Sequence, residues 1–307
     1  MEHVSQAVIS PARPDRSSLT HTGAVYVDGR LHAASQRQGS LAWKAVDPSV
    51  LPEAPEGIAV EHALYCGHFF LHFGHFLIET LPSLWWARDN HRKLIFHPWF
   101  GTLPNLPPFV RVALEALAID EDRLVFATDR LAVGDLLLPP RGNPMGGEPV
   151  VESLGVYRDV AERVAGQWPD SGARKFYVSR RFVRRNMRAV DEHLIENEFV
   201  QRGFRVVFPE QLSFAEQVSL VSRAEALAGV RGSALHLSGF MPPGSAVLEL
   251  TRRGAQGMNS LAAINEALGI RTVTAKVIAR EGEPRAGVAD IEALSAALDE
   301  SYPARVR

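Results

Sequence analysis

The second half of this sequence alternates short apolar runs with longer segments of helical period, and this alternation limits the available folds more than any other feature. The predicted strands are 175–178, 204–208, 226–230, 246–250 and 271–275, and the predicted helices are 190–202, 213–223, 233–240 and 257–268. Consecutive β-α units of this kind form an open parallel sheet covered by helices. Ligands of such sheets bind beyond the carboxyl ends of the strands, so the loops that follow the strands are expected to carry a site.

The first half is less regular but also mixes strands and helices. We predict strands at 93–96, 123–126 and 135–138 and helices at 75–89 and 108–118, and we expect residues 1–20 to be a flexible lead-in. A chain of 307 residues is long enough for two domains. Residues 139–147 are rich in proline and glycine, which break helix and strand alike. The predicted domains are therefore 1–145 and 146–307, and the helix predicted at 153–168 fits either one.

Charge and cysteine content exclude several classes of protein. Lys and Arg number 33 against 35 Asp and Glu, so no global positive field holds a nucleic acid, and we expect no nucleic-acid partner. A lone cysteine, Cys66, cannot form an internal disulfide or a Cys-based zinc site, which favours a reducing compartment. The apolar stretch 64–87 contains three histidines, a glutamate and a proline, too many polar groups for a lipid-exposed helix.

A cluster of basic residues follows the predicted strand 175–178. Its members are Lys175, Arg180, Arg181, Arg184, Arg185 and Arg188. A guanidinium group binds phosphate through paired N–H donors, so two or three such groups that converge would bind a diphosphate. The alternative is a solvated basic face, but the place of Arg180 and Arg185 just past the end of a strand favours a ligand site.

The segment Gly229 to Leu235 predicts a strand that leads through a glycine turn into a helix. Gly232 would let a ligand approach the backbone, Ser233 could cap the helix, and the free N–H groups there, with that of Ala234, favour a phosphate. Arg231 would add a full charge. Such turns also occur for packing alone, and this one is neither a Walker loop nor a GxGxxG motif, which disfavours a nicotinamide-dependent oxidoreductase.

Glu249 stands near the carboxyl end of the predicted strand 246–250. A carboxylate there could accept hydrogen bonds from both hydroxyls of a ribose. The competing interpretation is an ion pair with a neighbouring arginine, Arg252 or Arg253.

The segment 67–82 supplies a candidate base. On a helix that begins at His75, Glu79 lies one turn onward on the same face and could orient the imidazole as a general base. The imidazoles of His68, His72 and His75 also suggest a metal site. Their spacing is not the His-Glu-x-x-His pattern, so we expect no metal. Purely structural histidines among the surrounding phenylalanines are the other alternative.

Several of these segments together resemble glycosyltransferase family 61. The resemblance rests on Gly74-His75-Phe76-Leu77-Ile78-Glu79-Thr80-Leu81-Pro82, Ser179-Arg180, Asn197-Glu198, Gly203-Phe204, Phe214-x-Glu216-Gln217 and Gly229-x-Arg231-Gly232-Ser233-Ala234-Leu235. It covers about residues 60 to 252 and is closest to the bacterial members that make surface polysaccharides, capsule or lipopolysaccharide.

The resemblance implies a GT-B-type α/β architecture, two Rossmann-like domains facing across a cleft, and inverting transfer from a nucleotide sugar, foremost a UDP-sugar. It implies that domain 1–145 lies on the acceptor side and that domain 146–307 binds the nucleotide sugar. It implies that Arg180, Arg185 and the Arg231 to Ala234 turn hold the diphosphate and that Glu249 and Pro209 lie near the ribose or base. The further cleft candidates are His72, Asn197, Glu198 and Gln217.

The same resemblance gives the expected partners and location. The acceptor would be a glycan or a lipid-linked sugar, and the reaction would need no cofactor. We expect a cytoplasmic protein, with association at the inner face of the membrane and a homodimer both left open.

Two departures from the family pattern keep an alternative function open. Arg231 stands where many members have His, and Leu237 stands where Asn is frequent. If that His is needed for chemistry, this chain would be a noncatalytic subunit that binds a nucleotide sugar or glycan; if it only touches phosphate, Arg231 can replace it.

Overall fold

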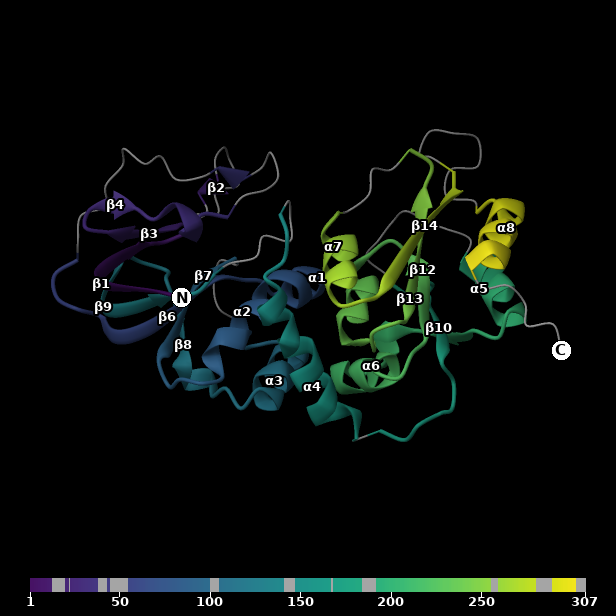
Figure 1. Ribbon diagram of the computed structural model, residues 1–307, viewed down its shortest axis with the longest axis horizontal. Helices are drawn as coiled ribbons and strands as arrows, with labels where there is room; N and C mark the ends of the chain where they lie inside the picture. The colour runs from purple at the N-terminus through teal and green to yellow at the C-terminus, as the bar shows by residue number, and fades with distance from the viewer. Residues whose placement is uncertain are drawn as a thin grey trace. The chain divides into compact units, whose positions relative to one another are not determined.

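The chain folds into two compact units, each built around its own sheet. The computed structural model describes residues 1–12, 20–21, 23–37, 43–44, 55–99, 105–140, 147–166, 168–183, 192–254, 259–279 and 289–301. Unit 1 is Met1–Val160 and unit 2 is Ala161–Arg307 (Figure 1). The boundary predicted after residue 145 falls in 141–146, outside the described residues.

Unit 2 contains a five-stranded sheet in which every neighbouring pair is parallel. The order is β11-β10-β12-β13-β14, formed by Arg205–Val207, Lys175–Val178, Ala226–Val230, Ala246–Arg252 and Arg271–Ile278. In chain order this is 2-1-3-4-5, a doubly wound arrangement whose strand order reverses between β10 and β12. The parallel sheet predicted from the alternation of strands and helices is thus confirmed, and the fold of unit 2 is Rossmann-like.

Helices cover both faces of this sheet. Helices α5 (Glu192–Gln201) and α8 (Ile291–Ser301) lie on one face, and α6 (Phe214–Val221) and α7 (Asn259–Ala267) lie on the other (Figure 1). On the first face Tyr177, Phe199 and Leu294 belong to one buried cluster. The helix predicted at 233–240 is present but is a 3-10 helix, η7 (Ser233–Phe240).

Local chemistry sets several of these boundaries. The Ser213 hydroxyl accepts a hydrogen bond from the Glu216 N–H at 3.3 Å, and the Glu216 carboxylate accepts one from the Ser213 N–H at 2.7 Å, which confirms the predicted capping box at the start of α6. Gly203 has a φ of 77°, the left-handed conformation expected where α5 ends. Gly229 lies where β12 approaches β10, and a Cβ there would stand 2.7 Å from the Val178 side chain.

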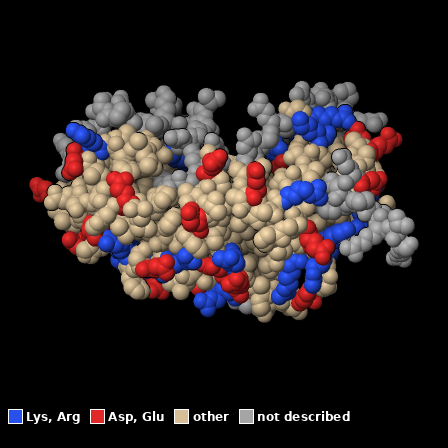
Figure 2. Space-filling model, in the orientation of Figure 1, with Lys and Arg blue, Asp and Glu red and all other residues tan. Residues whose placement is uncertain are grey.

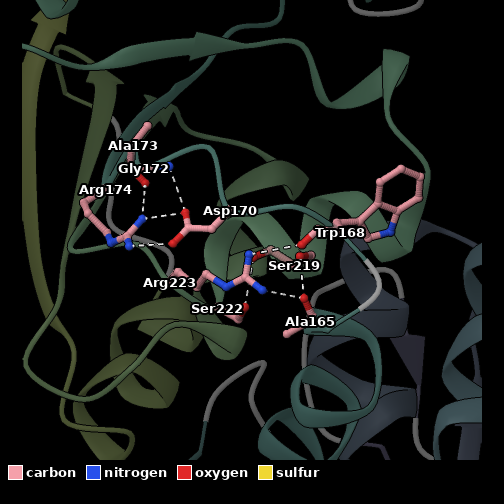
Figure 3. Close-up of polar contacts among 9 residues, drawn as sticks. All are labelled: Ala165, Trp168, Asp170, Gly172, Ala173, Arg174, Ser219, Ser222 and Arg223. Atoms are coloured by element: carbon pink, nitrogen blue, oxygen red, sulfur yellow. Dashed lines mark hydrogen bonds and ion pairs between the residues drawn. The ribbon is translucent and has the colours of Figure 1, made fainter.

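The segment between α4 (Gly155–Ala165) and β10 is fastened to α6 (Figure 3). Arg223 donates to the carbonyl oxygens of Ala165, at 2.6 Å, and Trp168, at 3.4 Å. Asp170 accepts two hydrogen bonds from Arg174, at 2.9 and 2.7 Å, and a third from the Gly172 N–H. Charged side chains therefore fix the path of the chain into the first strand of the parallel sheet.

Unit 1 is built on a seven-stranded mixed sheet of order β4-β3-β1-β9-β6-β7-β8. In that order the strands are Arg30–Leu31, Ala24–Val27, Glu2–Ser10, Leu131–Leu138, Val60–Phe69, Lys93–Pro98 and Leu124–Phe126. Strands β9, β6, β7 and β8 are mutually parallel, whereas β1, β3 and β4 join antiparallel. The helix α3 (Pro108–Ala116) confirms the predicted helix at 108–118, and a short pair, β2 (Thr20–His21) and β5 (Trp43–Lys44), lies outside the main sheet.

The expectation of a flexible lead-in at residues 1–20 is wrong for its first half. Strand β1 pairs with β9 on one side and β3 on the other, and Ala7 and Ile9 are buried. These partners come from positions more than ten residues away in the sequence, so the short run 2–10 alone gave little sign of a strand.

Acidic and basic side chains are intermingled over the face shown in Figure 2, in keeping with the nearly balanced charge of the sequence. Among the described residues, no helix is long and apolar enough to cross a membrane.

Candidate functional site

The predicted helix at 75–89 is helical but changes type along its length, which corrects the prediction of one regular α-helix. An α-turn, Phe73–His75, leads into a π-helical turn, Phe76–Thr80, followed by an α-turn, Leu81–Ser83, and a 3-10 turn, Leu84–Ala87. The physical reason lies in the backbone hydrogen bonds. The Leu81 N–H bonds to the Phe76 carbonyl, and Pro82 has no N–H to continue an α-helical ladder.

The π-helical turn is stabilised from outside the segment. The Tyr157 hydroxyl, on α4, donates a hydrogen bond of 2.7 Å to the Leu77 carbonyl, which the change of register leaves without its usual α-helical donor. The Thr80 hydroxyl accepts from the Phe70 N–H and donates to the His68 carbonyl. Helix and strand β6 are therefore locked together where the candidate base lies.

His75, Glu79 and Arg37 form a hydrogen-bonded chain in unit 1. The Nδ1 of His75 lies 2.6 Å from Glu79 Oε1, as the predicted i, i+4 pairing requires. Arg37 donates to both carboxylate oxygens of Glu79, from Nε at 2.7 Å and from Nη2 at 3.0 Å. The side chains of Arg37 and Glu79 are 2% and 10% exposed, whereas that of His75 is 34% exposed. The buried ion pair thus holds an imidazole that is itself partly exposed.

Electrostatics keep the carboxylate of this chain ionised. Burial of Glu79 alone would raise its pKa, but hydrogen bonds from His75 and Arg37 and the charge of Arg37 outweigh burial and lower the pKa below its ordinary value. Burial, together with nearby His75, lowers the pKa of His72, whose ring stands 5.3 Å from the His75 ring. The lowered pKa favours the neutral form of His72 beside the oriented His75.

The three histidines do not converge as metal ligands. His68 is buried with its ring 5.2 Å from the His97 ring, whereas His75 stacks on Phe70 at 5.1 Å. Over the described ranges, no group of three or more His, Cys, Asp or Glu side chains is placed to hold a metal ion.

In unit 2 the predicted phosphate residues meet where the strand order of the sheet reverses. Arg180 follows β10 and the Arg231 to Ala234 turn follows β12, and these strands are neighbours. Arg180 Nη1 donates to the Arg231 carbonyl at 3.1 Å, and a Cβ on Gly232 would lie 3.4 Å from the same nitrogen. The Arg180 guanidinium therefore lies against the turn that leads into η7, which begins at Ser233.

Two buried glutamates on α5 position the Ser179 to Arg181 turn, and the sequence analysis missed both. Glu192 accepts a 2.5 Å hydrogen bond from the Tyr177 hydroxyl, and burial raises the pKa of Glu192 despite that bond and another from the Arg180 backbone. Glu196 accepts from the Ser179 hydroxyl at 2.7 Å and pairs with Arg181 at 3.1 Å. Nothing in the local pattern distinguishes them from solvent-facing glutamates of a helix.

Arg231 and Glu249, predicted to bind diphosphate and ribose, bind each other. Arg231 donates from Nε to Glu249 Oε1 at 2.7 Å and from Nη2 to Oε2 at 2.6 Å. Their side chains are 16% and 7% exposed. The ion pair that the sequence analysis left open therefore exists, with Arg231 in place of Arg252 or Arg253.

The remaining candidates are dispersed. Gln217 donates to the carbonyl oxygens of Pro209, at 2.9 Å, and Leu212, at 3.0 Å, and so fixes the turn after β11. Asn197 is exposed on α5, and Glu198 pairs with Arg202, which also contacts Asp299 on α8. Arg185, with Arg184 and Arg188, lies outside the described residues.

Comparison with known proteins agrees with the motifs. A family model, Glycosyltransferase 61, matches residues 73–248, more than half of the chain, and confirms the family resemblance. The match begins at the His75 segment and ends within β13. No curated protein matches the chain.

Proposed function

Because this chain belongs to glycosyltransferase family 61, we propose that it transfers a sugar from a nucleoside-diphosphate donor, foremost a UDP-sugar, to a hydroxyl of a glycan or lipid-linked acceptor. The observation that carries the proposal is the chain of hydrogen bonds from Arg37 through Glu79 to His75. Such a chain orients an imidazole and stabilises the cation that forms when the imidazole takes a proton.

The reaction we propose is a direct displacement with inversion. With Nδ1 of His75 held by Glu79, Nε2 is the nitrogen that takes the acceptor proton. The acceptor oxygen forms a bond to the anomeric carbon while the bond from that carbon to the diphosphate breaks. The diphosphate leaves with the electron pair, so its growing negative charge must be met by the protein.

We assign the stabilisation of that negative charge to Arg180 and to the N–H groups of the turn at Gly232 to Ala234. Arg185 remains a candidate from the sequence alone. The Arg231 side chain already pairs with Glu249, so we give Arg231 a positioning role: its backbone carbonyl accepts the hydrogen bond from Arg180. Both oxygens of Glu249 are engaged as well. We therefore place the ribose toward Pro209, at the end of β11, where Gln217 holds the turn.

The proposal extends to the surroundings of the reaction. It includes a GT-B-type arrangement in which one unit serves the donor and the other the acceptor, a place in bacterial surface polysaccharide synthesis at the cytoplasmic side of the membrane, and no requirement for a cofactor. Activity that survives a chelator and does not rise with manganese would support the last point.

The first test is binding, followed by turnover. Thermal shifts against UDP-, GDP-, CMP- and dTDP-sugars and NAD(H), each with and without manganese, identify the donor, since a ligand of the native state raises apparent stability. With that donor, His75→Ala should reduce transfer about 100- to 10,000-fold. The matched control is His91→Ala, a histidine in unit 1 outside the hydrogen-bonded chain, which should transfer normally. Full transfer by His75→Ala would remove His75 as the base.

A noncatalytic subunit that binds a nucleotide sugar is the second candidate, favoured by one observation. Arg231 replaces the His common in the family, and its guanidinium is paired with Glu249. This candidate predicts donor binding without transfer to any acceptor. Hydrolysis of the donor by the wild type, abolished by His75→Ala, would decide against it.

A further inference from the structure

Phe182 and Phe208 form an aromatic pair at the surface of unit 2. Their ring centroids lie 4.9 Å apart with the planes tilted by 57°. Phe182 is 49% exposed, and its neighbour Val183 is 37% exposed. Leaving such apolar surface in water forgoes the stabilisation that burial would bring, and contiguous exposed apolar groups commonly mark binding surfaces.

The pair lies at the edge of the sheet that carries the phosphate candidates. Phe182 follows β10 and Phe208 follows β11, and these two strands are parallel neighbours. The turn at Gly232 follows β12, on the other side of β10. The edge therefore presents aromatic rings, then Arg180, then the start of η7, over two strand spacings, roughly 10 Å.

The guanidinium of Arg181 contacts both rings. The Arg181 Cζ atom lies 5.2 Å from the Phe182 centroid and 5.3 Å from the Phe208 centroid. Arg181 is itself held by the buried Glu196, which also binds the Ser179 hydroxyl. The aromatic surface is thus preorganised by the same turn that presents Arg180, which lowers the cost of ordering it on binding.

We propose that Phe182 and Phe208 form the stacking surface for the nucleobase of the donor. The inference rests on the proposed function, because it places the base of a nucleoside diphosphate whose phosphates lie at Arg180 and Gly232. Stacking of a base on an aromatic ring uses the π-face that every base has. The pair therefore supplies affinity for the nucleoside, and it does so for uracil and guanine alike.

The test separates the nucleoside from its phosphates. Dissociation constants for UDP, GDP and inorganic pyrophosphate are measured by calorimetry for the wild type, Phe182→Ala, Phe208→Ala and the double variant. We expect UDP and GDP to bind about 5- to 150-fold more weakly to the variants, the equivalent of about 1–3 kcal/mol. Pyrophosphate should bind as it does to the wild type.

The matched control is Trp168→Ala. Trp168 is another exposed aromatic of unit 2, 39% exposed, in the segment before β10 and away from the carboxyl edge (Figure 3). Its removal should leave UDP binding unchanged. Urea midpoints of all variants report whether the fold is intact, and Phe182→Leu, which keeps apolar bulk without a π-face, should fall between the wild type and Phe182→Ala.

The outcomes distinguish the two proposals. If the wild type binds UDP and the aromatic variants bind it equally well, or if they lose pyrophosphate binding to the same extent, the stacking inference is overturned and the donor site stands. If the wild type binds none of the nucleotides, the proposed function itself fails, and the stacking inference with it.

Discussion

The two candidate sites are built in opposite ways. In unit 2, Arg180 and Gly232 each follow directly after a strand of the parallel sheet, and the pairing of β10 with β12 brings them together. In unit 1, Glu79 depends on Arg37, which lies 42 positions earlier in the sequence and is buried. The order of the strands brings the unit 2 residues together, and ion pairs then position their side chains. In unit 1 the ion pair itself brings Arg37 and Glu79 together, so the arrangement fails when one member is lost.

The largest effect is expected from Arg37→Ala. The change leaves the buried Glu79 carboxylate without its bidentate partner, so the free energy of unfolding of unit 1 should fall by about 3–5 kcal/mol. Tryptophan fluorescence during urea unfolding follows this unit, because four of the five tryptophans lie in it.

The control for Arg37 is Arg88→Ala. Arg88 pairs with Asp159 at 2.8 Å, but both side chains are partly exposed, at 29% and 28%, so the loss should stay below about 1 kcal/mol. If both variants lose the same free energy of unfolding, burial of the charges does not explain the expected difference between the two ion pairs.

A second change asks whether unit 2 also depends on a buried pair. Arg231→Ala leaves Glu249 buried and should cost about 2–3 kcal/mol, less than Arg37→Ala because Arg231 is more exposed. The double variant Arg231→Met with Glu249→Leu removes both charges and should lose less stability than Arg231→Ala. Hydrogen exchange of the amides of β12 and β13 measures the stability of each variant. A double variant less stable than Arg231→Ala would contradict the prediction.

Gly229→Ala tests the close approach of β12 to β10. The added methyl group would stand 2.7 Å from the Val178 side chain and 3.0 Å from its carbonyl, so we expect a loss of about 1–3 kcal/mol and weaker donor binding. Gly166→Ala adds the same group in open space and serves as the control. Normal nucleotide binding by a folded Gly229→Ala would show that the spacing of these strands does not set the site.

The smallest effect concerns pH. The folded-state pKa of Glu79 lies below its ordinary value of 4.5, so its contribution to stability is present above that pH and is lost as the pH falls through the lowered pKa. The urea midpoint of unit 1 should therefore decline more steeply below about pH 4.5 in the wild type than in Glu79→Gln. Glu115→Gln, an exposed carboxyl on α3, should follow the wild-type curve.

The sequence predicted the elements of unit 2 better than those of unit 1. The strands at Lys175–Val178 and Ala226–Val230 were predicted with their observed bounds. Each is a short apolar run bounded by turns within a single β-α unit, so the local sequence is enough to locate it. Strand β1 was missed, because its pairing with β9 spans most of unit 1. The π-helical turn at Phe76–Thr80 was missed too, since it depends on Tyr157 as well as on Pro82.

The sequence by itself determined the family, the parallel sheet of unit 2, and the pairing of His75 with Glu79, because each is encoded within a few turns or strands of chain. The tertiary structure decided which charges meet: Arg37 with Glu79, Arg231 with Glu249, and Arg181 with Glu196. An arginine looks the same in sequence whether it faces solvent, a phosphate or a buried carboxylate. Its partner is set by the fold, because burying a charge costs several kcal/mol unless an opposite charge is brought to it.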